Sequence, residues 1–263
     1  MINFGQYAWD DFLAYKAALP PDAPLDQVLE QFSTTIDMAA WLGLVFLFEL
    51  ETYALPDAAF TKWVTRSLIF LRLICYVSIG YAAYGYTAVT LDYYRAEPVA
   101  GVTDLCELAG GDTTFQLDVI AYTGITVENC ATLTDGDVFY KVPDEVAVLD
   151  APTLDHVKKL GWIDVLNAFV WLIVVFLIEV EVRMQAADRF GTRALAILRQ
   201  AKTLFYGILI VNIFIWLATA YPLYAWDAFL WIFGFWAIEL NLAEWERDRT
   251  QQLADPSGGD PWE

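Results

Sequence analysis

The sequence predicts an all-α polytopic membrane protein: five transmembrane helices built from a repeated helical hairpin, plus a small disulfide-linked extracytoplasmic insert of β-rich or α+β character. Three observations lead to this fold class. Hydrophobic residues make up 58% of the 263 residues, which is more than one soluble domain of this length can bury. Five segments are apolar enough to cross a bilayer. Two cysteines lie in a polar stretch between the second and third of these segments.

Charge and residue usage argue against several classes of function. The 34 acidic residues outnumber the 15 basic ones and give a net charge of −19, which disfavours nucleic-acid binding. The single histidine, His156, disfavours haem b, His-rich metal sites and Ser-His or Cys-His hydrolysis. Motifs for nucleotide binding and for zinc proteases do not occur. We therefore expect a protein that is not an enzyme and that carries no cofactor.

The N-terminal region, residues 1–35, is predicted to be an extracytoplasmic amphipathic segment. It has neither the basic start nor the small-residue cleavage site of a signal peptide. Apolar and aromatic residues within 2–19 are typical of a short helix at the membrane interface. Three prolines between 20 and 24 end this helix, and Leu25 is predicted to begin the long first helix.

The apolar segments define the remaining organisation. The predicted spans cover residues 36–55, 68–88, 162–181, 204–222 and 225–243. The corresponding regions are a first transmembrane hairpin (36–88), an extracytoplasmic insert (89–160), a second hairpin (161–222), a fifth transmembrane helix (223–246) and an acidic cytoplasmic tail (247–263).

Basic residues predict the orientation. Ten of the fifteen fall on one side of the membrane when the spans alternate, and cytoplasmic loops are the ones enriched in Lys and Arg. The N-terminus and the insert are therefore expected outside, with the C-terminus in the cytoplasm of a bacterial inner membrane or an equivalent plasma membrane. The ten residues are Lys62, Arg66, Arg72, Arg183, Arg189, Arg193, Arg199, Lys202, Arg247 and Arg249.

The insert is acidic and has the composition of strands. Residues 114–123 and 125–134 are rich in Thr, Val, Ile and Tyr. Asp135-Gly136 predicts a hairpin turn between strands at 131–134 and 137–142. The insert carries 13 acidic residues, which favour a solvated surface.

The three cysteines are expected to differ in role. Cys106 and Cys130 both lie in the insert, so an oxidising compartment predicts a disulfide between them. Such a bridge contributes about 3 kcal/mol to a domain too small to hold itself together. Cys75 lies within the second span and is predicted to be a small packing residue.

An internal repeat is the most informative pattern. Residues 37–51, 167–181 and 227–241 align without gaps as [D/N]-x3-W-x4-[F/W]-x2-E-x-[E/N]. Hydrophobicity alone does not place Trp and Glu in register three times. The aligned columns are Asp37/Asn167/Asp227, Trp41/Trp171/Trp231, Phe46/Phe176/Trp236, Glu49/Glu179/Glu239 and Glu51/Glu181/Asn241.

A second element repeats after two of these helices. Residues 65–72 match 192–199 as T-R-x-L-x-x-L-R. The predicted unit is therefore a helical hairpin, present twice and followed by a lone third descending helix. Because alternate spans are parallel, the three repeated helices run in the same direction. A lone helix leaves one face for another protomer, which predicts a homo-oligomer or a subunit of a membrane complex.

The repeated polar residues are costly in a bilayer and need a partner, a proton or a wet cavity. One acidic column is predicted to form ion pairs with repeated arginines, and the other polar columns are predicted to line a path for cations or protons. The ion-pair residues are Glu49, Glu179, Glu239, Arg66, Arg72, Arg193 and Arg199. The pathway residues are Asp37, Glu51, Asn167, Glu181, Asp227 and Asn241.

Each pattern also has a plain structural interpretation. The second acidic column can snorkel to the water boundary, and the repeated tryptophans can pack between helices without gating anything. Asn212 can form an interhelical hydrogen bond instead of lining a path. The tyrosines and glycines of the second span indicate close helix packing, with a quinone or lipid slot as the alternative.

Three functions fit these features. The first is a cation or proton channel or transporter that uses intramembrane carboxylates. The second is a non-catalytic scaffold or accessory subunit of a larger membrane complex, whose acidic insert docks a basic partner. The third is a membrane enzyme that acts on lipid with a divalent metal. Pairing of the carboxylates with Arg66, Arg72, Arg193 or Arg199 would favour the scaffold.

Overall fold

The computed structural model describes residues 2–51, 55–56, 59–186 and 192–237. The chain forms two compact units, Met1–Phe169 and Val170–Glu263. Most of the described residues are helical, and a small sheet lies in the first unit.

Several helices are long and apolar enough to cross a membrane. Three qualify alone: α4 (Lys62–Asp92), α6 (Ala151–Ala186) and α7 (Thr192–Ala218). A fourth candidate is the bent pair α2 (Leu25–Gln31) and α3 (Ser33–Glu49). The chain is therefore a membrane protein with three or four candidate spans among the described residues. The predicted fifth span, 225–243, runs past residue 237, and its described part is helical.

The predicted long first helix is wrong, because the chain bends by 67° between α2 and α3. Phe32 leaves helical geometry at φ −92° and ψ 17°. The hydroxyl of Ser33 donates to the carbonyl of Glu30 at 2.7 Å, a local bond that bends helices. Asp11 of α1 (Ile2–Ala18) accepts a hydrogen bond from the backbone N–H of Thr35 at 2.8 Å. Asp11 thus caps the first turn of α3, whose backbone N–H groups have no partner within the helix, from another element.

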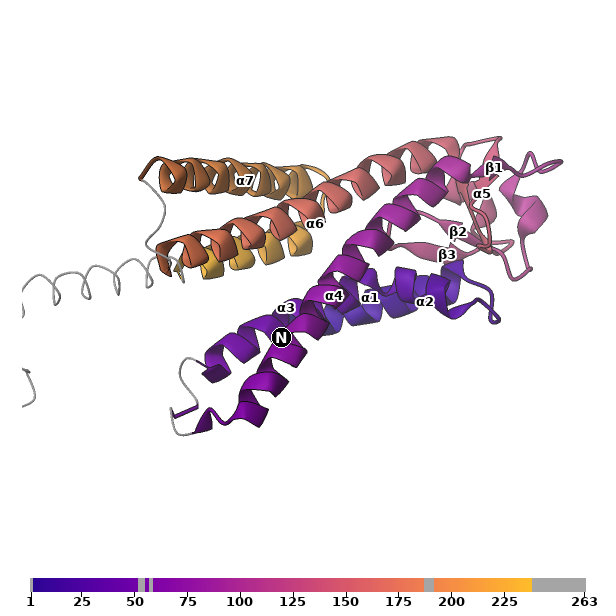
Figure 1. Ribbon diagram of the computed structural model, residues 1–263. Coiled ribbons are helices and arrows are strands. Elements are labelled where there is room, and N and C mark those ends of the chain that lie inside the picture. The colour runs from indigo at the N-terminus through magenta and orange to yellow at the C-terminus, as the bar shows by residue number, and fades with distance from the viewer. Residues whose placement is uncertain (1, 52–54, 57–58, 187–191, 238–263) are drawn as a thin grey trace, which may run out of the picture. The chain divides into compact units, whose positions relative to one another are not determined.

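Helices α3 and α4 lie side by side and touch through small residues (Figure 1). A Cβ atom on Gly85 of α4 would lie 2.0 Å from Oγ of Ser33, so only glycine fits there. A Cβ on Gly43 would lie 3.0 Å from Sγ of Cys75. Cys75 is a free thiol in the seam between the two helices, and this position fits its predicted role in packing.

Residues 93–150 form the disulfide-linked domain, which is built on a mixed five-stranded sheet. Its strand order is β1-β4-β5-β2-β3; β5 pairs with β2 in parallel and all other neighbours are antiparallel. The predicted β-rich or α+β insert is confirmed in this form. The strands are β1 (Glu97–Pro98), β2 (Thr114–Gln116), β3 (Tyr122–Gly124), β4 (Phe139–Lys141) and β5 (Ala147–Asp150).

Both faces of the sheet are covered. Phe139 and Val148 point into a core with Phe115, and the alternate residues Tyr140 and Leu149 belong to a second core. The second core includes Leu154 and Val157 of α6, so the helix packs directly against the sheet. Central strand β5 is buried at all four positions.

Two local predictions in this domain are wrong. The segment predicted as a strand at 125–134 contains helix α5 (Cys130–Leu133), because Asn129 and Thr126 cap each other's backbone N–H groups at 2.8 and 3.3 Å. Asp135-Gly136 does not form the hairpin turn. The Thr134 hydroxyl instead donates to Asp150 at 2.5 Å, and the hairpin between β4 and β5 closes at residues 142–146.

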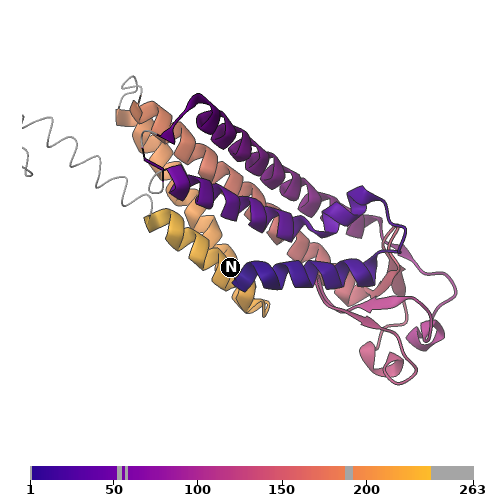
Figure 2. The same cartoon turned by 90° about the horizontal axis from the view of Figure 1, so that it is seen from below.

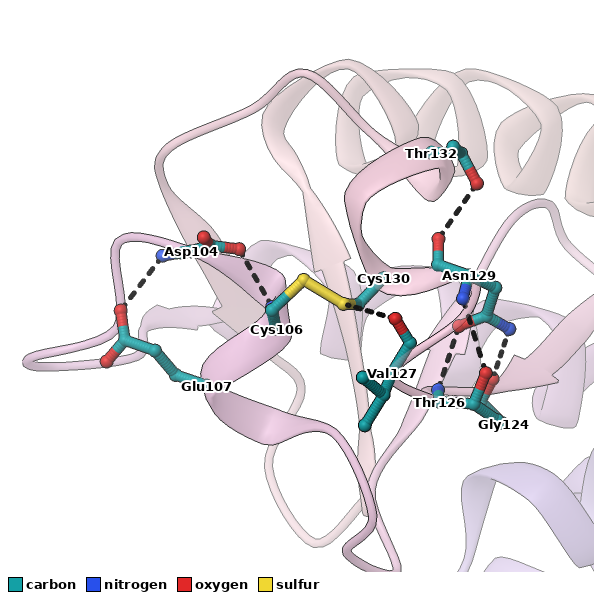
Figure 3. Close-up of a disulfide and its surroundings, with 9 residues drawn as sticks. All are labelled: Asp104, Cys106, Glu107, Gly124, Thr126, Val127, Asn129, Cys130 and Thr132. Carbon is teal, nitrogen blue, oxygen red and sulfur yellow. Dashed lines mark hydrogen bonds between the residues drawn. A yellow bond between two sulfur atoms is a disulfide. The ribbon is translucent and has the colours of Figure 1, made fainter.

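The predicted disulfide between Cys106 and Cys130 is confirmed (Figure 3). It joins α5 to the short helix η4 (Leu105–Leu108), with the two Cα atoms 4.9 Å apart. Asp104 and Glu107 form a capping box that fixes the first turn of η4. The bridge therefore links two helical turns that cover the same core of the sheet.

Helix α1 ends at the domain. The carbonyl of Ala17 accepts from the Thr114 hydroxyl at 2.6 Å, and the carbonyl of Ala18 accepts from the N–H of Val146 at 2.7 Å. Figure 2 shows α1 running to the edge of the strands. These bonds satisfy carbonyl groups that the end of a helix would otherwise leave unpaired.

In the second unit, Val170–Glu263, α6 continues beside α7 and a helix over 222–237. The rings of Trp171 and Trp231 both contact Phe235, with centroids 5.4 and 6.3 Å apart. Trp171 thus packs against the neighbouring helix, whereas Trp231 contacts a ring one turn along its own helix.

Candidate functional site

The acids of the second repeated column are held in ion pairs. Glu51 pairs with Arg72. Glu181 pairs with Arg199 at 3.3 Å and with Lys202 at 2.6 Å. Arg72 and Arg199 were predicted as partners of Glu49 and Glu179, and each pairs with the acid two residues further along the helix. Periodicity defines the faces of a helix but does not tell which face packs against the next helix.

The other predicted residues are placed as follows. Glu49, Glu179, Arg66 and Arg193 are exposed, and Asp37, Asn167 and Asp227 are half-buried. Glu239 and Asn241 lie outside the described residues. Asn212 is buried on α7.

Tyr86 of α4 brings together carboxylates from three other helices. Asp11 of α1, Asp37 of α3 and Asp164 of α6 all lie within electrostatic range of its hydroxyl. We name Asp11, Asp37, Tyr86 and Asp164 the Tyr86 cluster. All four residues belong to the first compact unit.

Close contact between α4 and α6 positions this cluster. A Cβ atom on Gly161 would lie 2.5 Å from Oγ1 of Thr90, so the two helices touch at these residues. Asp164 follows Gly161 by one helical turn, and Tyr86 precedes Thr90 by one turn on the antiparallel helix. The carboxyl group and the phenol are thereby brought to the same level of the helix pair.

Asp11 and Asp37 are each oriented by a hydrogen bond. Asp11 is buried and accepts from both the backbone N–H and the hydroxyl of Thr35, at 2.8 and 2.7 Å. Asp37 accepts from the indole N–H of Trp41 at 3.1 Å. This contact gives the first repeated tryptophan a definite role as a donor to the repeated Asp.

Two acids of the Tyr86 cluster have no basic side chain paired with them among the described residues. Across the described part of the chain, no basic side chain forms an ion pair with Asp11 or Asp164. Burial raises the pKa of Asp11 to about 6, and Asp10 adds to the rise while hydrogen bonds from Thr35 oppose it. Asp11 therefore gains and loses a proton near neutral pH.

A metal site needs several ligands close together, whereas a proton site needs only one. Within the described ranges, no three His, Cys, Asp or Glu side chains lie close enough together to hold a metal ion. A proton needs only one carboxylate with a hydrogen-bonding neighbour, and the Tyr86 cluster supplies this arrangement.

The pattern of the sequence identified Asp37 but missed Asp11, Tyr86 and Asp164. Asp164 lies at the start of a predicted span, three residues before Asn167, and the repeat drew attention to Asn167 instead. Tyr86 lies one turn before Thr90 on the face that meets α6. The one-turn spacing of Tyr86 and Thr90 places them on one face of α4. The sequence did not show that this face packs against α6.

Comparisons of the chain with protein-family models, curated protein sequences and solved structures gave no match. The functional interpretation therefore depends on the residues described above.

Proposed function

We propose that the chain is an integral membrane protein that moves protons or small cations, with the Tyr86 cluster as its binding site. One observation carries this proposal: three carboxyl groups from separate helices lie within electrostatic range of one phenol, and two of them have no basic partner among the described residues. Ionisable groups between apolar helices are expensive to maintain and usually serve an ion or proton path.

This proposal changes the predicted pathway. Glu51 and Glu181 are neutralised by basic residues, so we assign them a structural role instead. Asp37 stays in the pathway and is joined by Asp11 and Asp164.

The repeated hairpin is part of the same proposal. Glu51 and Glu181 occupy one repeat column, and Arg72 and Arg199 occupy equivalent positions of the second repeated element. A pair formed twice by equivalent residues supports two copies of one unit. We further propose five spans, with the N-terminus and the disulfide-linked domain outside a bacterial inner membrane.

A second candidate function is a non-catalytic scaffold or accessory subunit. The ion pairs of Glu51 and Glu181 favour it, because an acid paired with a basic residue of the next helix can stabilise helix packing without serving an ion path. The disulfide-linked domain would dock the partner in this case. A homo-oligomer is compatible with both functions.

Proton and cation flux into proteoliposomes tests the first function. The purified full chain is reconstituted, and flux is compared for wild type, Asp164→Asn, Asp37→Asn and Glu51→Gln. We expect Asp164→Asn and Asp37→Asn to lower flux at least tenfold and Glu51→Gln to leave it within twofold. Asp155→Asn, an exposed acid near the start of α6, is the matched control.

The two functions give different results. Wild-type vesicles without flux under either a proton or a cation gradient would contradict transport. A salt-sensitive complex with a second protein, isolated from native membranes and lost on charge reversal of exposed domain acids, would then support the scaffold.

A further inference from the structure

We infer that Lys158, Tyr94 and Trp162 form a binding site for the headgroup of an anionic phospholipid, on the membrane face next to the disulfide-linked domain. The site lies where α4 and α6 leave the bilayer. This inference goes beyond the proposed function, because it needs only that these two helices cross a membrane and does not depend on transport. All three residues belong to the first compact unit.

Tyr94 connects the side chains of the site. It lies in the short helix η3 (Tyr93–Arg95), which follows α4 directly. Its hydroxyl accepts a hydrogen bond from the indole N–H of Trp162 at 3.0 Å, and Nζ of Lys158 lies 4.8 Å from the centroid of its ring. Lys158 and Trp162 are one turn apart on the same face of α6, so both reach this one phenol.

The same face of α6 continues into the bilayer as an apolar stripe. Leu166 and Phe169 follow Trp162 at helical spacing, and all three side chains are exposed. Along the helix the stripe therefore presents first an ammonium group, then an indole and then apolar side chains. A phospholipid presents its phosphate, its interfacial region and its acyl chains in the same order.

The depth of the stripe agrees with this match. The apolar span predicted for α6 begins at residue 162, and the span predicted for α4 ends at residue 88. Trp162 thus lies at the limit of the hydrocarbon core, where Trp and Tyr are enriched in membrane proteins. Lys158 lies about 6 Å further along α6 towards the domain, at the level of the headgroups.

The charge of Lys158 is not neutralised by an acid in the described part of the chain. Lys159 pairs with Asp155, and Arg95 pairs with Asp92 at 2.9 Å, but no described carboxylate forms an ion pair with Lys158. The face of the Tyr94 ring attracts the ammonium group but carries no net charge to neutralise it. The ammonium group therefore keeps N–H donors for a phosphate oxygen.

The distribution of charge favours a lipid over a soluble anion. Acidic residues outnumber basic ones by 13 to 4 within 89–160, so the domain itself repels anions that approach from solution. Three of the four basic residues nevertheless lie beside the spans, at Arg95, Lys158 and Lys159. Basic residues next to a transmembrane helix are typical of sites for anionic headgroups. A soluble anion would also leave the apolar part of the stripe without a partner.

Fluorine NMR and native mass spectrometry of the full chain in detergent test the site. Fluorotryptophan labels every tryptophan, and the resonance that is missing in Trp162→Phe identifies Trp162. We expect phosphatidylglycerol to shift this resonance in a saturable way and to bind at least fivefold more tightly than phosphatidylcholine. Native mass spectrometry should find at least fivefold less retained phosphatidylglycerol in Lys158→Gln and an amount within twofold of wild type in Lys158→Arg. Lys159→Gln is the matched control and should also stay within twofold, because Asp155 already pairs with Lys159.

Each outcome decides the inference. A shift of the Trp162 resonance by inorganic phosphate at the same concentration would assign the site to a soluble anion and overturn the lipid. Equal affinity for the two lipids would overturn it, and so would equal loss of lipid in Lys158→Gln and Lys159→Gln. Thermal unfolding confirms that each variant is folded, and the comparison of the two lipids needs wild type alone. None of these measurements involves flux, so failure of the lipid site leaves the proposed function standing.

Discussion

Glu181 and Lys202 form an ion pair that is almost completely shielded from solvent. Their Oε2 and Nζ atoms lie 2.6 Å apart, and the side chains are 9% and 10% exposed. Glu51, which aligns with Glu181 in the sequence, pairs with Arg72 at side-chain exposures of 25% and 35%. Two acids of one sequence column are therefore paired in different environments.

This difference predicts unequal costs of substitution. Glu181→Gln removes from Lys202 the carboxylate at 2.6 Å and is expected to destabilise the protein by about 3–5 kcal/mol. Glu51→Gln removes a more exposed pair and is expected to cost less than about 1 kcal/mol. Denaturation of both variants in detergent measures the difference. Lys202→Met in the Glu181→Gln background should recover most of the loss, and equal costs for the two single variants would contradict the prediction.

Hydropathy and cysteine position predicted much of the fold, because both signals are local. The apolar segments became α4, α6 and α7, and the two cysteines of the polar insert were joined. The bend at Phe32 was missed because it depends on Ser33 and on Asp11, which lies in another helix. Helix α5 was missed because the reciprocal Thr126 and Asn129 bonds override strand propensity.

Gly85 and Gly80 of α4 are expected to respond oppositely to alanine. A Cβ on Gly85 would meet Oγ of Ser33 at 2.0 Å, so Gly85→Ala should cost about 1–3 kcal/mol through displacement of α3. Nothing lies within 4 Å of a Cβ on Gly80, so Gly80→Ala should stabilise by about 0.5–1 kcal/mol through helix propensity. Thermal unfolding in detergent checks both. Ser33→Gly should partly rescue Gly85→Ala, and its failure to do so would place the conflict elsewhere.

The disulfide is expected to stabilise the domain of residues 93–150 without affecting the contact between α3 and α4. Cys106→Ser with Cys130→Ser should destabilise the domain by about 3 kcal/mol, since the bridge closes a loop across a sequence separation of 24. Limited proteolysis within residues 93–150 measures the opening. A reducing agent should reproduce the effect in wild type and in Cys75→Ser alike, because Cys75 is a free thiol. If the domain still resists proteolysis after the disulfide is reduced, the sheet alone is enough to keep the domain folded.

The site was harder to predict than the fold, because its members are distant in the sequence. Asp37 was identified from the repeat, but Asp11 and Asp164 join it only after α1, α3 and α6 pack around α4. The ion-pair partners shifted by two residues for the same reason. A sequence pattern tells on which face of a helix a residue lies. Only the packing of the helices tells which element contacts that face.

Glu145 predicts that the protein loses stability as pH rises. Its pKa is about 8 in the folded protein and 4.5 in the absence of perturbation, so the folded state binds the extra proton between these values. The contribution is fully present below about pH 4.5 and is lost as pH rises through about 8; its size is on the order of 5 kcal/mol. Asp11 acts in the same direction between its ordinary pKa of 3.8 and about 6.

Unfolding midpoints from pH 5 to pH 9 separate the two acids. Wild type should lose stability up to about pH 8, Glu145→Gln should lose much less than wild type between pH 7 and 8, and Asp11→Asn should keep the loss between pH 7 and 8. Glu128→Gln, an exposed acid of the same domain, should follow wild type. A Glu145→Gln profile as steep as that of wild type between pH 7 and 8 would show that another group holds the proton.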